Sequence, residues 1–249
     1  MSSLPVPLSL PDAVWRGDQM GSCRSQTMPS GHAALDSELP GNGWPSSALT
    51  ELLLADHGIG EWRLLAPALS SLTATGKKLI LLAPPYTLHA GALHALGIRL
   101  NNILLIAANK QNDRVWAAEQ VLKSASFGAL LCWFPQIRNE HLRRLQLAAT
   151  GCEGLTFVFR PSTAQEQSSP APLRLVCQPA QMGRLSVDIV KRRGPVLGTP
   201  LVLPLSIPHT LVRPLAEAHA ASLSSSPSHA VDRASFSATS ARRSTALSV

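Results

Sequence analysis

The sequence predicts an α/β protein with a mostly parallel β-sheet flanked by helices. Five short apolar runs alternate with segments of helical periodicity between residues 48 and 159. Such an alternation is typical of parallel strands joined by crossover helices, and the crossovers should be right-handed. The run at 79–82 is apolar at every position, as expected for a strand that is covered on both faces.

The chain begins with a predicted N-terminal arm, residues 1–27, whose one distinctive piece is the segment 14–17 (Val-Trp-Arg-Gly). The predicted domain follows at 28–205. Ser30 is expected to cap a short helix that carries Ala34 and Leu35 on its apolar side. The turn-rich segment 40–45 then leads into the first core strand.

The alternating elements can be assigned from their periodicity and their flanking residues. The first long helix, 61–75, is strained by Pro67 and ends at Gly76. In chain order we expect a strand at 48–54, this helix, a strand at 79–82, a helix at 87–96, a strand at 103–106, a helix capped by Asn112 or Asp113, a strand at 129–133, a helix opened by Asn139, and a strand at 155–159.

The pattern changes after residue 161. Residues 162–172 read as a flexible loop. Two strands, 173–178 and 184–191, are joined by a turn at 181–183, and they predict an antiparallel extension of the sheet edge, with 201–205 as a further short strand. The serine-rich residues 206–249 are predicted to be a disordered tail, because they hold too few apolar side chains to form a core.

Composition limits the classes of function. Lys and Arg number 22 against 15 Asp and Glu, a net charge of +7, which allows an acidic protein or a nucleic acid as partner but also fits a merely basic surface. The four cysteines form no C-x-x-C pair, so neither a disulfide framework nor a zinc site is expected. Without a signal-peptide pattern or a membrane-length apolar run, we expect a soluble cytoplasmic protein with no membrane partner.

The segment 52–65 has the layout of a phosphate-binding loop: a buried strand, a glycine turn and a helix. Its residues do not suit phosphate. Gly60 is present, but Ala55 stands at the first glycine position, Glu61 at the lysine position and Trp62 at the hydroxyl position. A carboxylate repels phosphate and an indole cannot ligate magnesium, so we interpret the loop as vestigial. A simple strand–turn–helix without such an ancestry would also fit.

Two further groups of a phosphate-loop enzyme are missing. Trp133 stands where the metal-binding aspartate would end the strand 129–132, and residues 83–86 (Ala-Pro-Pro-Tyr) replace the catalytic carboxylate. The phosphate-binding lysine, the metal-binding aspartate and the catalytic carboxylate are thus all absent. Their absence predicts a non-catalytic pseudo-ATPase with no catalytic residue, cofactor or metal. The aromatic side chains around this place form core, fill the vacated pocket or offer a partner surface: Trp62, Tyr86, Trp133 and Phe134.

A basic cluster, Lys191, Arg192 and Arg193, follows the predicted strand 184–191. Such a cluster can contact a phosphate backbone or an acidic partner, and it is equally typical of a solvated strand end. The helical pair Arg143 and Arg144 is a weaker candidate of the same kind.

With these residues in view, segments 35–45 and 49–53 resemble the lead-in to the phosphate loop of RecA-type recombinases. Residues 14–205 more closely resemble the ImuA family of RecA-like accessory proteins, and the serine-rich end lies outside this resemblance. The matching segments are 14–17, 41–45, 58–61, 82–86, 143–148, 157–161 and 191–195. The fold expected from this resemblance is a degenerate RecA-like, phosphate-loop-type core.

The resemblance implies a non-catalytic adaptor in SOS-induced, error-prone translesion DNA synthesis and repair. Its implied partners are an ImuB-like inactive Y-family polymerase and an error-prone replicative-type polymerase subunit, with contact to RecA or DNA also implied. The alternative is a SulA-type cell-division inhibitor that binds FtsZ, since the SulA family shares the core through residues 159–161. The strands at 173–205 and the basic cluster favour the first hypothesis. An enzyme with an unrecognised mechanism is a third, weaker hypothesis.

Overall fold

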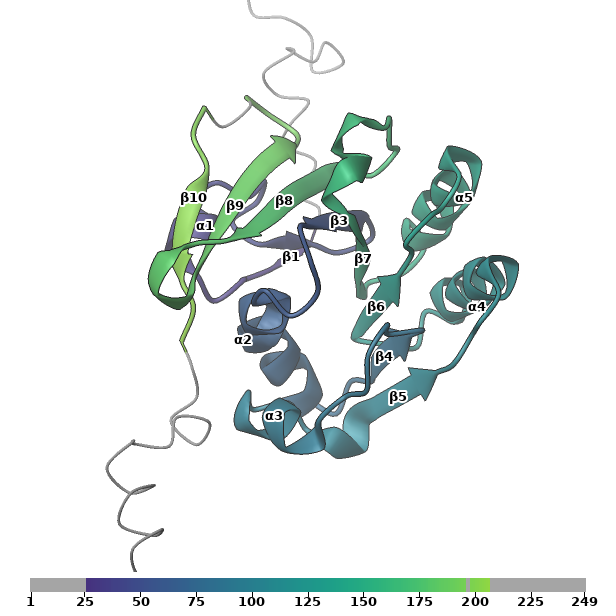
Figure 1. Cartoon of the computed structure of the whole chain (residues 1–249). Coiled ribbons are helices and arrows are strands. Elements are labelled where there is room, and N and C mark those ends of the chain that lie inside the picture. The colour runs from purple at the N-terminus through teal and green to yellow at the C-terminus, as the bar shows by residue number, and fades with distance from the viewer. Residues whose placement is uncertain (1–25, 196–197, 207–249) are drawn as a thin grey trace, which may run out of the picture. The chain divides into compact units, whose positions relative to one another are not determined.

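The computed structural model describes residues 26–195 and 198–206 (Figure 1). Its main sheet has eight strands in the order β10-β9-β8-β3-β7-β6-β4-β5. The strands are β3 Leu49–Leu54, β4 Leu79–Leu82, β5 Ile103–Ile106, β6 Ala129–Trp133, β7 Leu155–Pro161, β8 Leu173–Pro179, β9 Arg184–Lys191 and β10 Leu201–Pro204. The helices are α1 Ala33–Asp36, α2 Glu61–Ala74, α3 Ala90–Ala95, α4 Gln111–Ser124 and α5 Asn139–Ala149.

The strands from β8 to β5 pair in parallel, whereas β9 pairs antiparallel with both β8 and β10. The predicted mostly parallel sheet flanked by helices is therefore confirmed. One detail of the prediction was wrong. Strand β8 pairs in parallel with β3, with Leu52 opposite Leu175, so the antiparallel extension begins only at β9.

Helices α2 and α3 lie on one side of the sheet, and α4 and α5 lie on the other (Figure 1). One apolar cluster joins α2 to the sheet through Leu65 and Leu69, and a second joins α4 and α5 to it through Val115 and Leu142. The central strands are therefore covered on both faces, which explains their continuous apolar runs. Strand β5 lies at the sheet edge, and its Leu104 and Leu105 are 51% and 55% exposed.

Several local details differ from the sequence prediction. Ser30 is not a helix cap: α1 begins after His32, whose backbone N–H donates to Ser30 Oγ (3.1 Å). Helix α4 begins at Gln111, so neither Asn112 nor Asp113 caps it. The expected loop 162–172 contains a 3₁₀ helix, η3, at Ser162–Glu166. Helix α2 continues through Pro67 to Ala74, as predicted to within one residue.

The ends of the chain are only partly described. Thr27, which we placed in the arm, lies in β1 (Thr27–Met28), which pairs antiparallel with β2 (Trp44–Pro45). The remaining arm residues, including 14–17, and the serine-rich tail from 207 onward lie outside the described residues. None of the helices in the described part is long and apolar enough to span a bilayer.

Candidate functional site

The candidate site is the loop between β3 and α2, residues 55–60, at the middle of the sheet. Glu61, the first residue of α2, turns its carboxylate back into this loop. Its Oε1 accepts the backbone N–H of Gly58 (2.8 Å) and its Oε2 accepts that of Gly60 (3.1 Å). A helix N-terminus with free amides favours an anion. Here the anion is a side chain of the protein itself, and Glu61 is only 1% exposed.

The loop depends on glycine for this geometry. Gly58 and Gly60 have φ of +80° and +127°, a region that residues with a Cβ rarely adopt. A Cβ added at Gly60 would lie 2.9 Å from Leu205 Cδ1. These two glycines therefore let both amides point at the Glu61 carboxylate.

Two aromatic side chains complete the hydrogen bonding of Glu61. Trp62 Nε1–H donates to Tyr86 Oη (2.7 Å), and Tyr86 O–H donates to Glu61 Oε1 (3.2 Å). Burial, and next the charge of Glu61, raise the pKa of Tyr86 well above its usual range. The phenol therefore stays protonated and remains a donor to the carboxylate.

Trp133 ends β6 in the place where the sequence led us to look for a metal-binding aspartate. Its ring is buried and stacks on Phe159 with the centroids 4.6 Å apart, while Trp62 and Tyr86 lie at 6.1 and 6.2 Å. Among the three alternatives for these aromatics, Trp133 and Phe134 are core, and Trp62 and Tyr86 pack against that core. A cavity of about 300 Å³ remains beside Trp133 and Ala55.

Within residues 26–195 and 198–206, no three or more His, Cys, Asp or Glu side chains lie close enough together to hold a metal ion. Cys132, Cys152 and Cys177 are buried free thiols. Burial raises the pKa of each thiol, to about 12 for Cys177. A thiol held protonated in this way is a poor nucleophile.

A buried ionic network lies next to the loop, and the sequence analysis missed it. Glu51 in β3 is fully buried and accepts Arg174 Nε–H from β8 (2.8 Å), with Arg160 Nη1 of β7 at 3.5 Å. Ser169 O–H also donates to Glu51. The sequence signal was available, because charged residues inside apolar strands are rare unless they are paired. Nothing local indicated which residues would be the partners.

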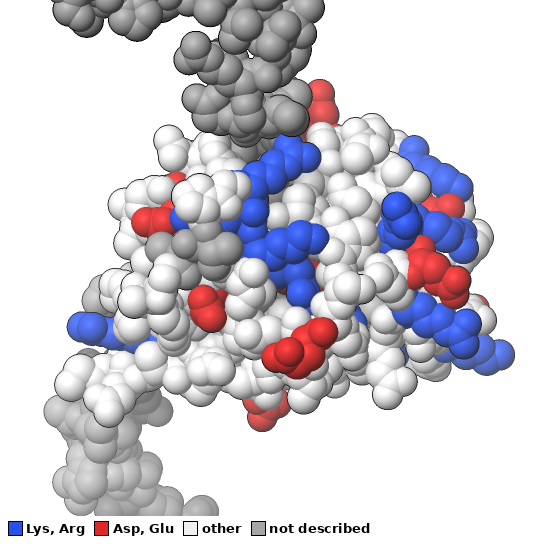
Figure 2. All heavy atoms as spheres, turned by 90° about the horizontal axis from the view of Figure 1, so that it is seen from above, with Lys and Arg blue, Asp and Glu red and all other residues white. Residues whose placement is uncertain are grey.

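The structure does not bring the predicted basic cluster together as one free patch. Lys191 Nζ donates to the Ser169 carbonyl (2.6 Å), and Arg192 forms an ion pair with Glu38 (2.9 Å). Burial, and next the charge of Arg174, lower the pKa of Lys191. Arg193 alone of the three is exposed. Figure 2 shows Lys and Arg in separate groups on the face it views.

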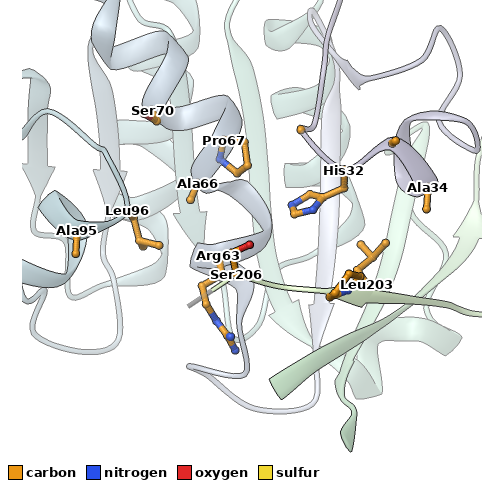
Figure 3. A pocket seen from close by; sticks show the side chains of 13 residues that line it. His32, Ala34, Arg63, Ala66, Pro67, Ser70, Ala95, Leu96, Leu203 and Ser206 are labelled. Atoms are coloured by element: carbon orange, nitrogen blue, oxygen red, sulfur yellow. The ribbon is translucent and has the colours of Figure 1, made fainter. Parts of the chain in front are cut away.

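A cavity of about 620 Å³ lies away from the loop, between α1, α2, α3 and β10 (Figure 3). His32 and Arg63 project beside it, and the small side chains of Ala66 and Ser70 from α2 also line it. His32 Nε2 lies 3.1 Å from the Leu64 carbonyl, and Arg63 Nη1 donates to the Leu205 carbonyl (3.3 Å). Both polar side chains are thus already engaged within the fold.

Fold and site together define an α/β protein whose β3–α2 loop amides bind the protein's own Glu61 carboxylate. Comparison with known proteins then names a family: residues 48–156 match the family described as "Cell division inhibitor SulA". The cell division inhibitors SulA of Yersinia pestis (strain Pestoides F) and Yersinia pseudotuberculosis serotype O:1b (strain IP 31758) are each 26% identical over 116 residues, which cover 47% of this chain and 69% of the relative.

The matched region runs from β3 to the start of β7, so it contains the loop, Glu61 and Trp133. This part of the chain is similar to the SulA family, and strands β8 to β10 lie beyond it. The comparison therefore supports the SulA alternative of the sequence analysis better than the ImuA hypothesis.

Proposed function

We propose that this protein is a SulA-type inhibitor of cell division, which acts by binding FtsZ in the cytoplasm rather than by turning over a nucleotide. The observation that carries the proposal is the similarity of residues 48–156 to the SulA family. The net charge of +7 suits an acidic protein surface as the partner.

The proposal includes a degenerate RecA-like, phosphate-loop-type core without ATPase activity. Support comes from the loop at the end of the central strand β3, whose amides bind Glu61 in place of a phosphate. Further support comes from Trp133, which packs in an aromatic cluster where a metal carboxylate would be required. The groups needed for hydrolysis are thus replaced by groups that pack.

Two experiments test the proposal separately. Controlled expression in bacteria should produce filamentous cells, and FtsZ should co-purify with the protein; normal division at high expression would argue against an inhibitor. A matched control is Leu69→Asp, which places a charge in the core beneath α2 and should abolish both effects. Titration with a fluorescent ATP analogue tests whether the protein binds nucleotide. Micromolar, magnesium-dependent binding would contradict a pseudo-ATPase.

A second function, an ImuA-type adaptor in error-prone translesion synthesis, is favoured by one observation. Strands β8 to β10 extend the sheet beyond the SulA-matched region, and Arg174 of β8 is bonded into the centre of the fold. A pull-down after DNA damage with an ImuB-like polymerase and an error-prone replicative-type subunit tests it. Loss of damage-induced mutagenesis on deletion, with division unaffected, would select the adaptor over the inhibitor.

A further inference from the structure

A second polar pocket, of about 580 Å³, opens beside the loop site. It lies between the β6–α5 connection, the N-terminus of α4 and the 3₁₀ helix η3. Most of its lining side chains are polar or basic: Gln111, Gln136, Arg138, Arg160, Thr163 and Gln167. Arg160 lines both this pocket and the cavity beside Trp133.

Arg160 is the central group of this pocket. It is only 4% exposed; its Nη1 forms an ion pair with Glu51 at 3.5 Å, and its Nε donates no hydrogen bond within the described part of the chain. Its Nη2 donates to Gln167 Oε1 (2.6 Å). A buried guanidinium with unmatched N–H groups costs free energy, on the order of 1–3 kcal/mol per unsatisfied group. Arg160 and Arg174 share the single carboxylate of Glu51, so among the described residues one buried positive charge remains without an anionic partner.

Two helix ends add to the attraction for an anion. Helix α4 has 14 residues and α5 has 11, and neither has a side-chain cap at its N-terminus. Gln111 begins α4 and Arg138 immediately precedes α5, and both line the pocket. Free first-turn amides and the positive end of the helix dipole favour negative charge there.

We propose that this pocket binds one carboxylate group, supplied by an Asp or Glu side chain of a protein partner. The exposed Gln167 occupies the entry position: its amide oxygen already accepts from Arg160 and can be displaced by a charged acceptor of the same planar shape. The inference rests on the proposed function only for the source of the carboxylate.

A monoanion fits the local charges better than a phosphate dianion. Arg138 lies 3.6 Å from Glu140, and Glu51 lies behind Arg160 at 3.5 Å. Arg138 thus faces Glu140. Arg160 and Arg174 share Glu51, so one positive charge remains uncompensated in the described part of the chain, and a second negative charge on the ligand would be left without a partner. A planar carboxylate also matches the fork of a guanidinium.

The test uses the α-amide of N-acetylglutamate, which carries one side-chain carboxylate, as a calorimetric probe of the full-length protein at constant ionic strength. Saturable binding is expected for the wild type. Gln167→Glu should weaken it at least about tenfold, because an internal carboxylate then occupies Arg160 as Glu61 occupies its loop. Gln167→Ala should bind equally well or more tightly.

The matched control is Gln165→Glu, which adds the same charge two residues away at an exposed position outside the pocket lining. It should leave binding unchanged, and equal weakening by both charge variants would overturn the site. No saturable binding to the wild type would also overturn it, and preferential binding of inorganic phosphate would overturn the carboxylate assignment. These results are independent of FtsZ, so they separate failure of the pocket from failure of the inhibitor function.

Discussion

The Glu61 carboxylate accepts the backbone N–H of Gly58, three residues before it, at 2.8 Å, and so closes the β3–α2 loop on itself. A phosphate-binding loop leaves these amides free for its ligand. Under the proposed relationship to a phosphate-binding loop, Glu61 at the lysine position does more than remove a positive charge. It adds an internal anion, which satisfies the same donors and keeps the strand–turn–helix geometry without a nucleotide.

The first prediction concerns this carboxylate. Glu61→Ala should lower the free energy of unfolding by about 1–3 kcal/mol, since two loop amides and the Tyr86 hydroxyl lose their acceptor in a buried place. Urea denaturation measures the change. Asp56→Ala is the control, because Asp56 is an exposed loop carboxylate that accepts only the His57 amide. A loss no larger than that of the control would show that the loop does not need its anion.

The buried network gives the second prediction. Glu51→Ala should destabilise the protein by about 3–5 kcal/mol, because Arg160 and Arg174 would then lie buried without their carboxylate. Glu140→Ala, which removes an exposed carboxylate facing Arg138, should change stability by less than about 1 kcal/mol. Similar losses in the two variants, measured by chemical denaturation, would be inconsistent with a central role for Glu51.

The third prediction is that residues of the basic cluster differ in their effect on stability. Arg192→Ala removes a half-buried ion pair with Glu38 and should lower stability by up to about 1 kcal/mol, whereas Arg193→Ala should leave stability unchanged. A variant that replaces Lys191, Arg192 and Arg193 together would therefore change both the stability of the fold and any binding, so the two effects could not be separated. Loss of partner or DNA binding in Arg193→Ala alone would identify a contact. If Arg193→Ala binds its partner or DNA as well as the wild type does, the cluster is only a solvated strand end.

The buried thiols predict a loss of stability at alkaline pH. The pKa of Cys177 rises to about 12, chiefly through burial and secondly through the charge of Glu61. In the unfolded chain a thiol ionises near pH 8.5. Between these values the unfolded state binds fewer protons than the native state, so stability falls as pH rises, by at most about 1.4 kcal/mol per pH unit for one thiol.

Urea midpoints measured between pH 8 and pH 11 test this dependence. Cys177→Ala should reduce the slope by one proton, and Cys132→Ala should act in the same direction because the pKa of that buried thiol is raised as well. An unchanged slope in both variants would assign the alkaline loss to other groups.

The sequence by itself determined the fold class and the order of the elements, and it placed Glu61 and Trp133 at the ends of the elements around the β3–α2 loop. These properties are local: apolar runs, helical periodicity and the identity of residues such as Glu61 and Trp133 are visible within one or two turns of chain. The sequence also predicted the strand, turn and helix that the structure shows as β3, residues 55–60 and α2.

Only the tertiary structure decided what the replaced groups do. Tyr86 reaches Glu61 across 25 residues, Arg174 reaches Glu51 across 123, and Arg192 reaches Glu38 across 154. These pairings follow from which strands become neighbours and in which register, and local patterns do not specify either one. The sequence therefore predicted a loop without phosphate-binding residues, while the fold supplied the partners of Glu61 and Glu51.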